Sequence, residues 1–82
     1  MKKMSRLYRL SKKMTDAEEK EVLREIRAIK NINKVEITEG KTYIMVKTLE
    51  NEYERVMPKV ENICRRVARG CEVSFTQFVY ED

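Results

Sequence analysis

The chain has 82 residues, of which 41% are hydrophobic and 39% are charged, and its formal net charge is +4. A chain of this length forms one small domain. It contains no histidine, which excludes a histidine base or a histidine-ligated metal centre within the chain. No apolar run approaches the roughly 20 residues that span a bilayer, so we expect no direct membrane insertion. Two cysteines do not form a disulfide framework, and we expect a reducing, cytoplasmic location.

The positive charge is concentrated at the start of the chain. Residues 1–13 carry a charge of +6 with no acidic residue, so residues 14–82 sum to −2. A basic segment of this kind can attract acidic surfaces or phosphates. The simpler interpretation, which we favour, is that the lysines protect an edge strand or a frayed terminus from pairing with other chains.

The first quarter of the chain predicts a strand followed by a helix. Residues 4–11 alternate between faces as a strand does. Thr15 and Asp16 both suit a helix N-cap, and each is followed three residues later by a glutamate, as a capping box requires. Apolar residues then recur at helical spacing, which predicts a helix over residues 16–31.

A β-hairpin is predicted next. Residues 34–39 and 42–48 alternate between apolar and polar side chains, and Glu39-Gly40 between them is a turn signal.

The second half predicts another helix and a final strand. Asn51 and Glu54 have the spacing of a second capping box, before a helix over residues 52–69. Pro58 lacks a backbone donor, so we expect it to kink this helix or to split off the first turn. Alternation over residues 71–80 predicts the last strand.

These elements predict the fold. Their order is strand, helix, strand, strand, helix, strand, and two right-handed crossovers bring the first and third strands together at the centre. The expected fold class is an α+β, ferredoxin-like βαββαβ sandwich that spans residues 1–82 as a single domain. Its antiparallel four-stranded sheet has the order 4-1-3-2, with both helices on one face. The fold class by itself does not determine the function.

Three segments carry a resemblance to a known family. The run from Met14 to Glu19 is similar to a Met-Thr-Cys-Ala-Ala-Cys turn, and residues 29–35 are similar to a Leu-Pro-Gly-Val stretch before the second strand. The tail from Val60 to Val73, which ends in Arg69-Gly70-Cys71-Glu72-Val73, looks like the end of the version found in zinc and cadmium ATPases. On these residues the chain resembles the heavy-metal-associated domain of metallochaperones and of the cytoplasmic N-termini of metal-transporting P-type ATPases.

The chain departs from this family at the metal turn, where Asp16 and Glu19 stand at the two cysteine positions. Two carboxylates alone hold a divalent ion weakly, and a helix N-terminus disfavours a cation but favours acidic capping residues. We therefore favour a capping role. A second hypothesis stays open, because the topology brings Cys71 to the same end of the domain. Asp16, Glu19 and Cys71 would then form a weak zinc or cadmium site.

The open face of the sheet is a second candidate site. The residues expected to line it are Tyr8, Tyr43, Met45, Phe78 and Tyr80. An exposed face of this kind serves docking or dimerisation, or it stacks RNA bases when basic side chains lie beside the aromatics. We favour docking or dimerisation over RNA, because the third strand lacks the glycine- and aromatic-rich octamer of RNA-recognition modules.

The function implied by the resemblance is that of a non-catalytic domain with a degenerate metal turn and no required cofactor. It would be the cytoplasmic regulatory or interaction domain of a metal-transporting P-type ATPase, or a free-standing relative. Its partners would be other domains of the transporter or a second copy of itself. The alternatives are a nucleic-acid-binding module that uses the basic first strand and the sheet aromatics, and a dimerisation or structural domain. No catalytic constellation is found, so we do not expect an enzyme.

Overall fold

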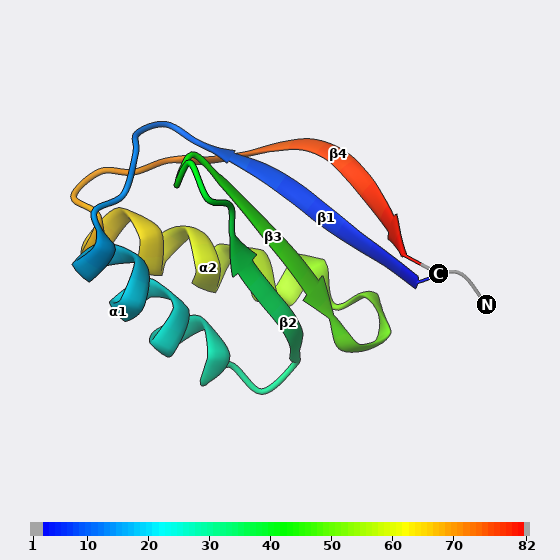
Figure 1. Ribbon diagram of the computed structural model, residues 1–82. Helices are drawn as coiled ribbons and strands as arrows, with labels where there is room; N and C mark the ends of the chain where they lie inside the picture. The colour runs from blue at the N-terminus through cyan, green and yellow to red at the C-terminus, as the bar shows by residue number, and fades with distance from the viewer. Residues whose placement is uncertain (1–2, 82) are drawn as a thin grey trace.

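A four-stranded antiparallel sheet is the frame of the computed structural model, which describes residues 3–81. Along the chain the elements are β1 (Lys3–Leu10), α1 (Asp16–Arg27), β2 (Ile32–Ile37), β3 (Tyr43–Thr48), the short 3₁₀ turn η1 (Leu49–Asn51), α2 (Tyr53–Val67) and β4 (Val73–Glu81). The strand order is β2-β3-β1-β4, which is the order 4-1-3-2 read from the other edge. Both helices lie against one face of the sheet (Figure 1). The arrangement confirms an α+β fold with two helices, and it is compatible with a ferredoxin-like sandwich.

The hydrophobic core fills the space between the two helices and this face of the sheet. Every element except η1 contributes to it. The most completely buried apolar side chains are Val22, Ile26, Ile44, Val46 and Val60. Burying one such side chain contributes about 1.5–3 kcal/mol, so this layer holds the helices on the sheet. Within residues 3–81, no helix combines the length and apolar character needed to cross a membrane.

Helix α1 begins as predicted and ends earlier. Thr15, rather than Asp16, is the N-cap: its Oγ1 accepts the Glu18 N–H at 3.1 Å, and Glu18 Oε1 accepts the Thr15 N–H at 2.9 Å. The helix ends at Arg27 instead of residue 31. Ile29 continues the apolar spacing because it packs against the core from the turn that follows the helix. Periodicity alone therefore overestimated the helix length.

Helix α2 begins within one residue of its predicted start, but the predicted capping box is wrong. Asn51 does not cap the helix; it lies in η1 with a φ of +57°, a conformation that asparagine tolerates better than most residues. The N-cap is Glu52, whose side chain makes no capping hydrogen bond. Pro58 lies within one continuous helix, so the first turn is not split off.

Strand β4 contains an irregularity that its sequence did not reveal. Leu7 lies opposite Gln77, but Tyr8 lies opposite Phe75, which leaves Thr76 as the extra residue of a β-bulge. Thr76 Oγ1 donates a hydrogen bond to the Leu7 carbonyl at 2.9 Å. Because one residue is inserted, the alternation of β4 changes sides at this point.

The capping box can be tested by replacing Thr15 with alanine. Thr15→Ala removes the acceptor of the Glu18 N–H, so we expect the free energy of unfolding to fall by about 1 kcal/mol in chemical denaturation. Thr38→Ala is the matched control, since Thr38 is exposed and its hydroxyl makes no hydrogen bond within residues 3–81. An equal loss in both variants would contradict the capping role.

Candidate functional site

Lys41 lies between the carboxylates of Asp16 and Glu19. We call the segment from Met14 to Glu19 the metal-type turn. Lys41 lies in the β2–β3 hairpin with a φ of +60°. Its Nζ is 3.0 Å from Asp16 Oδ1 and 3.9 Å from Glu19 Oε1. The Lys41 carbonyl also accepts the backbone N–H of Met14 at 3.2 Å. One hairpin residue therefore fastens the β1–α1 loop and supplies a positive charge to both acidic side chains.

The ion pair changes the titration of both partners. The hydrogen bond from Lys41, followed by the charge of its ammonium, lowers the pKa of Asp16. The same hydrogen bond raises the pKa of Lys41, with the Asp16 charge as the next cause. The Asp16 side chain is 88% exposed, so solvent screens the pair and its contribution to stability is small.

Cys71 lies at the same end of the domain, as the topology predicted, but it is completely buried. Its Sγ is 4.0 Å from the Lys12 carbonyl oxygen and 4.0 Å from that of Glu72. Among residues 3–81, no three Cys, Asp or Glu side chains lie close enough together to hold a metal ion. The structure thus brings Asp16 and Glu19 together around Lys41 without adding the Cys71 thiol to them.

Cys64 is a core residue of α2. It is fully buried, and burial raises the pKa of its thiol to about 12, with smaller effects from Cys71 and Glu61. A thiol with this pKa is protonated at neutral pH and is therefore a poor nucleophile.

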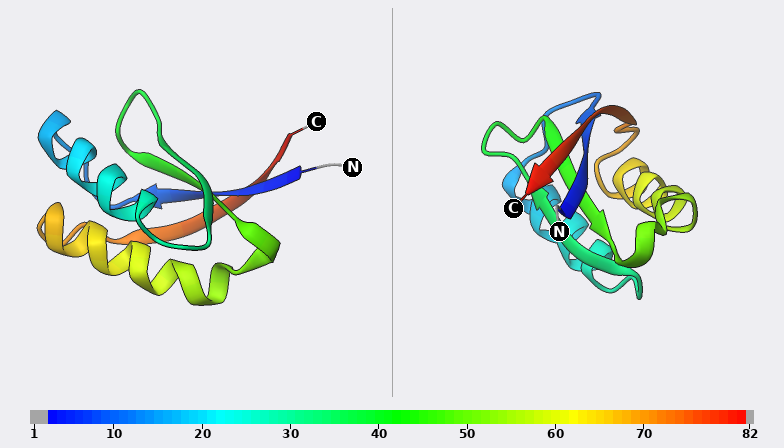
Figure 2. Two further views of the ribbon diagram at one scale, coloured as in Figure 1. Left: turned by 90° about the horizontal axis from the view of Figure 1, so that it is seen from below. Right: turned by 90° about the vertical axis from the view of Figure 1, so that its right-hand side faces the viewer.

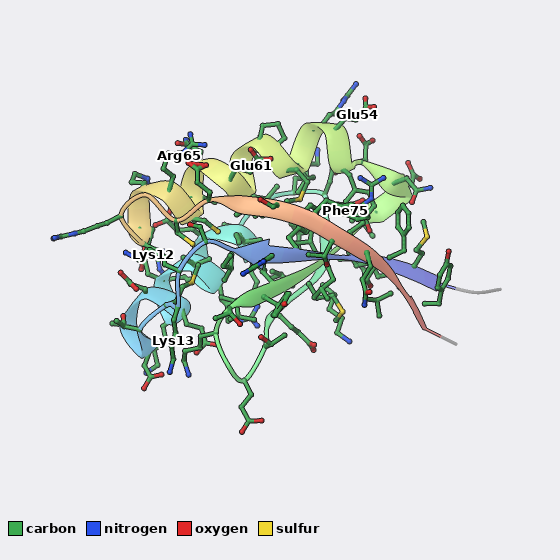
Figure 3. The ribbon with its side chains drawn as sticks, turned by 90° about the horizontal axis from the view of Figure 1, so that it is seen from above. Lys12, Lys13, Glu54, Glu61, Arg65 and Phe75 are labelled. Carbon is green, nitrogen blue, oxygen red and sulfur yellow. The ribbon has the colours of Figure 1, made fainter. Side chains whose placement is uncertain are left out.

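Three exposed cations lie at the same end of the domain as the metal-type turn from Met14 to Glu19. Lys12 Nζ donates to the Arg69 carbonyl at 3.5 Å, and no carboxylate within residues 3–81 pairs with Lys12, Lys13 or Arg69. Arg65 is paired, since its Nε lies 3.2 Å from Glu72 Oε1. Figure 3 shows Lys12 and Lys13 near the start of α1, at one end of the molecule. We call Lys12, Lys13 and Arg69 the turn-end cations.

The five residues predicted to line the open sheet face do not share one face. Tyr43 and Met45 lie on the open face, and Tyr43 is 36% exposed. Tyr8 is only 5% exposed and belongs to the core under the helices. Phe78 and Tyr80 lie on the helix side of β4, because the bulge shifts their alternation. The expectation of a single aromatic surface is therefore corrected.

A different aromatic cluster forms on the helix side of β4. The ring centroids of Phe75 and Phe78 are 5.1 Å apart, and those of Tyr8 and Phe75 are 5.7 Å apart. The Arg6 guanidinium carbon lies 4.1 Å from the Tyr53 ring centroid and 5.5 Å from that of Phe78. Arg6 and Phe75 could not be assigned to this cluster from the sequence, because without the bulge the aromatics of β4 divide between two faces.

This geometry weakens the nucleic-acid hypothesis. Among residues 4–80, Tyr43 is the only aromatic side chain on the open face, whereas base stacking uses several aromatic platforms. The cations of the basic first segment are also dispersed. Arg6 packs on the helix side, Arg9 lies on the open face, and Lys12 and Lys13 lie in the following loop.

No known protein-family model matches the chain, and no curated protein sequence matches it either. The resemblance to heavy-metal-associated domains therefore rests on the residues of the turn and on the order of the elements.

Removing the Lys41 ammonium tests its role at the turn. In Lys41→Met we expect the pKa of Asp16, followed by NMR, to rise toward its ordinary value. The folded-state pKa of Asp16 lies below its unfolded value, so the pair stabilises the fold above the unfolded pKa, and this contribution is lost as the pH falls through the folded pKa. Lys41→Met should therefore be less stable than wild type near neutral pH, and the difference should disappear in acid.

Lys13→Met is the matched control, because Lys13 affects Asp16 only through its charge at longer range. A larger Asp16 shift in Lys13→Met than in Lys41→Met would show that the hydrogen bond to Lys41 is not the main cause.

Proposed function

We propose that this chain is a non-catalytic interaction domain, ferredoxin-like and related to heavy-metal-associated domains, in which a lysine of the chain takes the place of a bound metal. The observation that supports the proposal is the position of Lys41, whose Nζ lies within 4 Å of carboxylate oxygens of both Asp16 and Glu19. These two residues stand where the family has its thiolate ligands.

The chemistry of the turn favours an internal cation over a metal ion. Two carboxylates are too few ligands for a tight divalent site, and a helix N-terminus disfavours a further positive charge. A metal ion would also have to displace the Lys41 ammonium, which the hairpin backbone keeps beside the two carboxylates. Asp16 and Glu19 thus close the turn, and the domain functions without a required cofactor.

Docking through the turn end is the activity that this arrangement supports. Lys41 compensates one of the two charges of Asp16 and Glu19. The three turn-end cations outnumber the single negative charge that remains, which leaves an excess of positive charge. Such a surface fits an acidic protein surface and accelerates association at low ionic strength. The resemblance suggests that the acidic partner surface belongs to another domain of a metal-transporting P-type ATPase. This domain would lie in the same chain, or it would be the partner of a free-standing relative.

A zinc titration tests the replacement of the metal. Zinc chloride added to the uniformly ¹⁵N-labelled protein should cause no saturable chemical-shift change at Asp16, Glu19 or Cys71. Cys71→Ala removes the thiol of the alternative site, and Lys41→Met removes the internal cation that would compete with a metal ion. Saturable zinc binding by the wild type that is lost in Cys71→Ala would contradict the proposal and would support a three-ligand site.

An acidic polymer tests the docking surface. Poly-aspartate should shift the NMR signals of residues around the turn, and the shifts should weaken as salt is added. A Lys13→Glu/Arg69→Glu variant should bind about tenfold more weakly, since each exposed ion pair contributes up to about 1 kcal/mol. Lys30→Glu/Lys59→Glu is the control, because it changes the net charge by the same amount at two exposed residues that lie away from the turn. Equal weakening in both variants would show only a general effect of net charge.

A further inference from the structure

Strand β4 forms one edge of the sheet, and within residues 3–81 no strand pairs with the outer side of its backbone. From Val73 to Tyr80 its sequence contains no charged residue, no proline and no glycine. Natural proteins usually protect long edge strands with charges, proline or short length. β4 has nine residues and, apart from its bulge, none of these protections before Glu81.

The end of β4 is also accessible. β1 pairs with β4 from Lys3 to Leu10, but it pairs with β3 only from Arg6 to Arg9. The beginning of β1 and the end of β4 therefore project beyond β3 as a two-stranded ribbon, as Figure 1 and Figure 2 show. The part of β4 after the bulge thus lies at the opposite end of the domain from the turn-end cations.

The bulge gathers the aromatic side chains of β4 on one side. Phe78 lies opposite Arg6 and Tyr80 lies opposite Met4, which places both rings on the same face as Phe75. Helix α2 does not cover these rings, since Phe75 is 48%, Phe78 42% and Tyr80 66% exposed. Figure 3 shows Phe75 where β4 passes alongside α2. Bulges commonly redirect side chains toward a functional surface.

We propose that this edge binds a second copy of the chain, with the two β4 strands paired antiparallel about a two-fold axis at Val79. The segment after the bulge is regular, so it can continue the hydrogen-bond ladder of the sheet. In this register Phe78 lies opposite the partner subunit's Tyr80, and Val79 lies opposite the partner subunit's Val79. Aromatic pairs stack on one face and valines meet on the other, which stabilises adjacent strands.

The area and the charge of the edge both favour a second copy over a foreign strand. The three rings expose roughly 300 Å² together, more than a third of the about 800 Å² that each partner buries in a stable interface. A foreign strand would form the same backbone hydrogen bonds. A second copy also brings an uncharged strand with matching aromatics, and antiparallel pairing of identical strands is two-fold symmetric by nature.

The dimer goes beyond the proposed docking function. Because the two-fold lies far from the turn, the dimer presents two sets of turn-end cations at its outer ends and raises the effective concentration of the second set. Failure of one proposal is distinguishable from failure of the other. The zinc and poly-aspartate titrations report on the turn, whereas self-association reports on β4.

Sedimentation equilibrium of the full chain tests the dimer. At about 100 μM the wild type should be dimeric, and Phe78→Lys and Tyr80→Lys should each weaken the dimer by at least about tenfold. Tyr43→Lys is the matched control, since it places the same charge on an exposed aromatic of the open face. Circular dichroism verifies that each variant is folded, and Tyr80 is exposed enough for substitution to leave the core intact. A monomeric wild type would overturn the proposal, as would a dimer that only Tyr43→Lys disrupts.

Disulfide trapping tests the register of the two strands. Cα atoms of directly opposed residues in an antiparallel pair are about 4.5–5.5 Å apart, within the range that a disulfide bridges. Val79→Cys should therefore crosslink the dimer under mild oxidation. Gln77→Cys should not, because each Gln77 lies opposite residue 81 of the partner. The native cysteines are fully buried and do not compete. More efficient crosslinking through Gln77→Cys than through Val79→Cys would overturn the proposed axis.

Discussion

The structure depends on one constraint: two helices can cover only one face of a four-stranded sheet. Each strand must therefore direct alternate residues toward the helices, and any change in alternation changes which side chains are buried. β3 obeys this rule throughout, with Ile44, Val46 and Thr48 buried in succession. β4 obeys it only as far as the bulge at Thr76. Beyond the bulge, Phe78 and Tyr80 lie on the helix side of the sheet, but α2 leaves them exposed. The exposed aromatics of β4 thus arise from the same constraint that forms the core.

The turn from Met14 to Glu19 is held by contacts within the chain. The turn is held by the Thr15–Glu18 capping box, by Met14, which is 1% exposed, and by the Met14–Lys41 backbone hydrogen bond. None of these contacts requires a metal ion. Acidic residues at a helix N-terminus are stabilised by the helix dipole, and Lys41 provides the remaining compensation for Asp16 and Glu19. The geometry of the loop is in this way independent of the chemistry that the family resemblance suggests.

Arg6 illustrates a cation held by aromatic faces instead of carboxylates. Its Nε is buried and has no hydrogen-bond partner within residues 3–81, which carries a desolvation cost. The faces of Tyr53 and Phe78 offset part of this cost through cation–π attraction. The Tyr53 hydroxyl in turn lies 3.3 Å from the carbonyl oxygens of Met4 and Val46, where β1 and β3 separate. One arginine therefore links α2 to the part of the sheet from which the terminal ribbon projects.

The sequence alone determined the class of fold, because apolar periodicity and turn residues are local properties of the chain. The strand order, the capping box at Thr15 and the burial of Cys64 could all be predicted from spacing. Only the tertiary structure decided the rest. The lysine that meets Asp16 and Glu19 comes from a hairpin more than twenty residues away, and no local pattern identifies it. The bulge in β4 is defined only by its register with β1. The faces of Phe78 and Tyr80 therefore depend on this pairing, and the sequence of β4 alone does not reveal them.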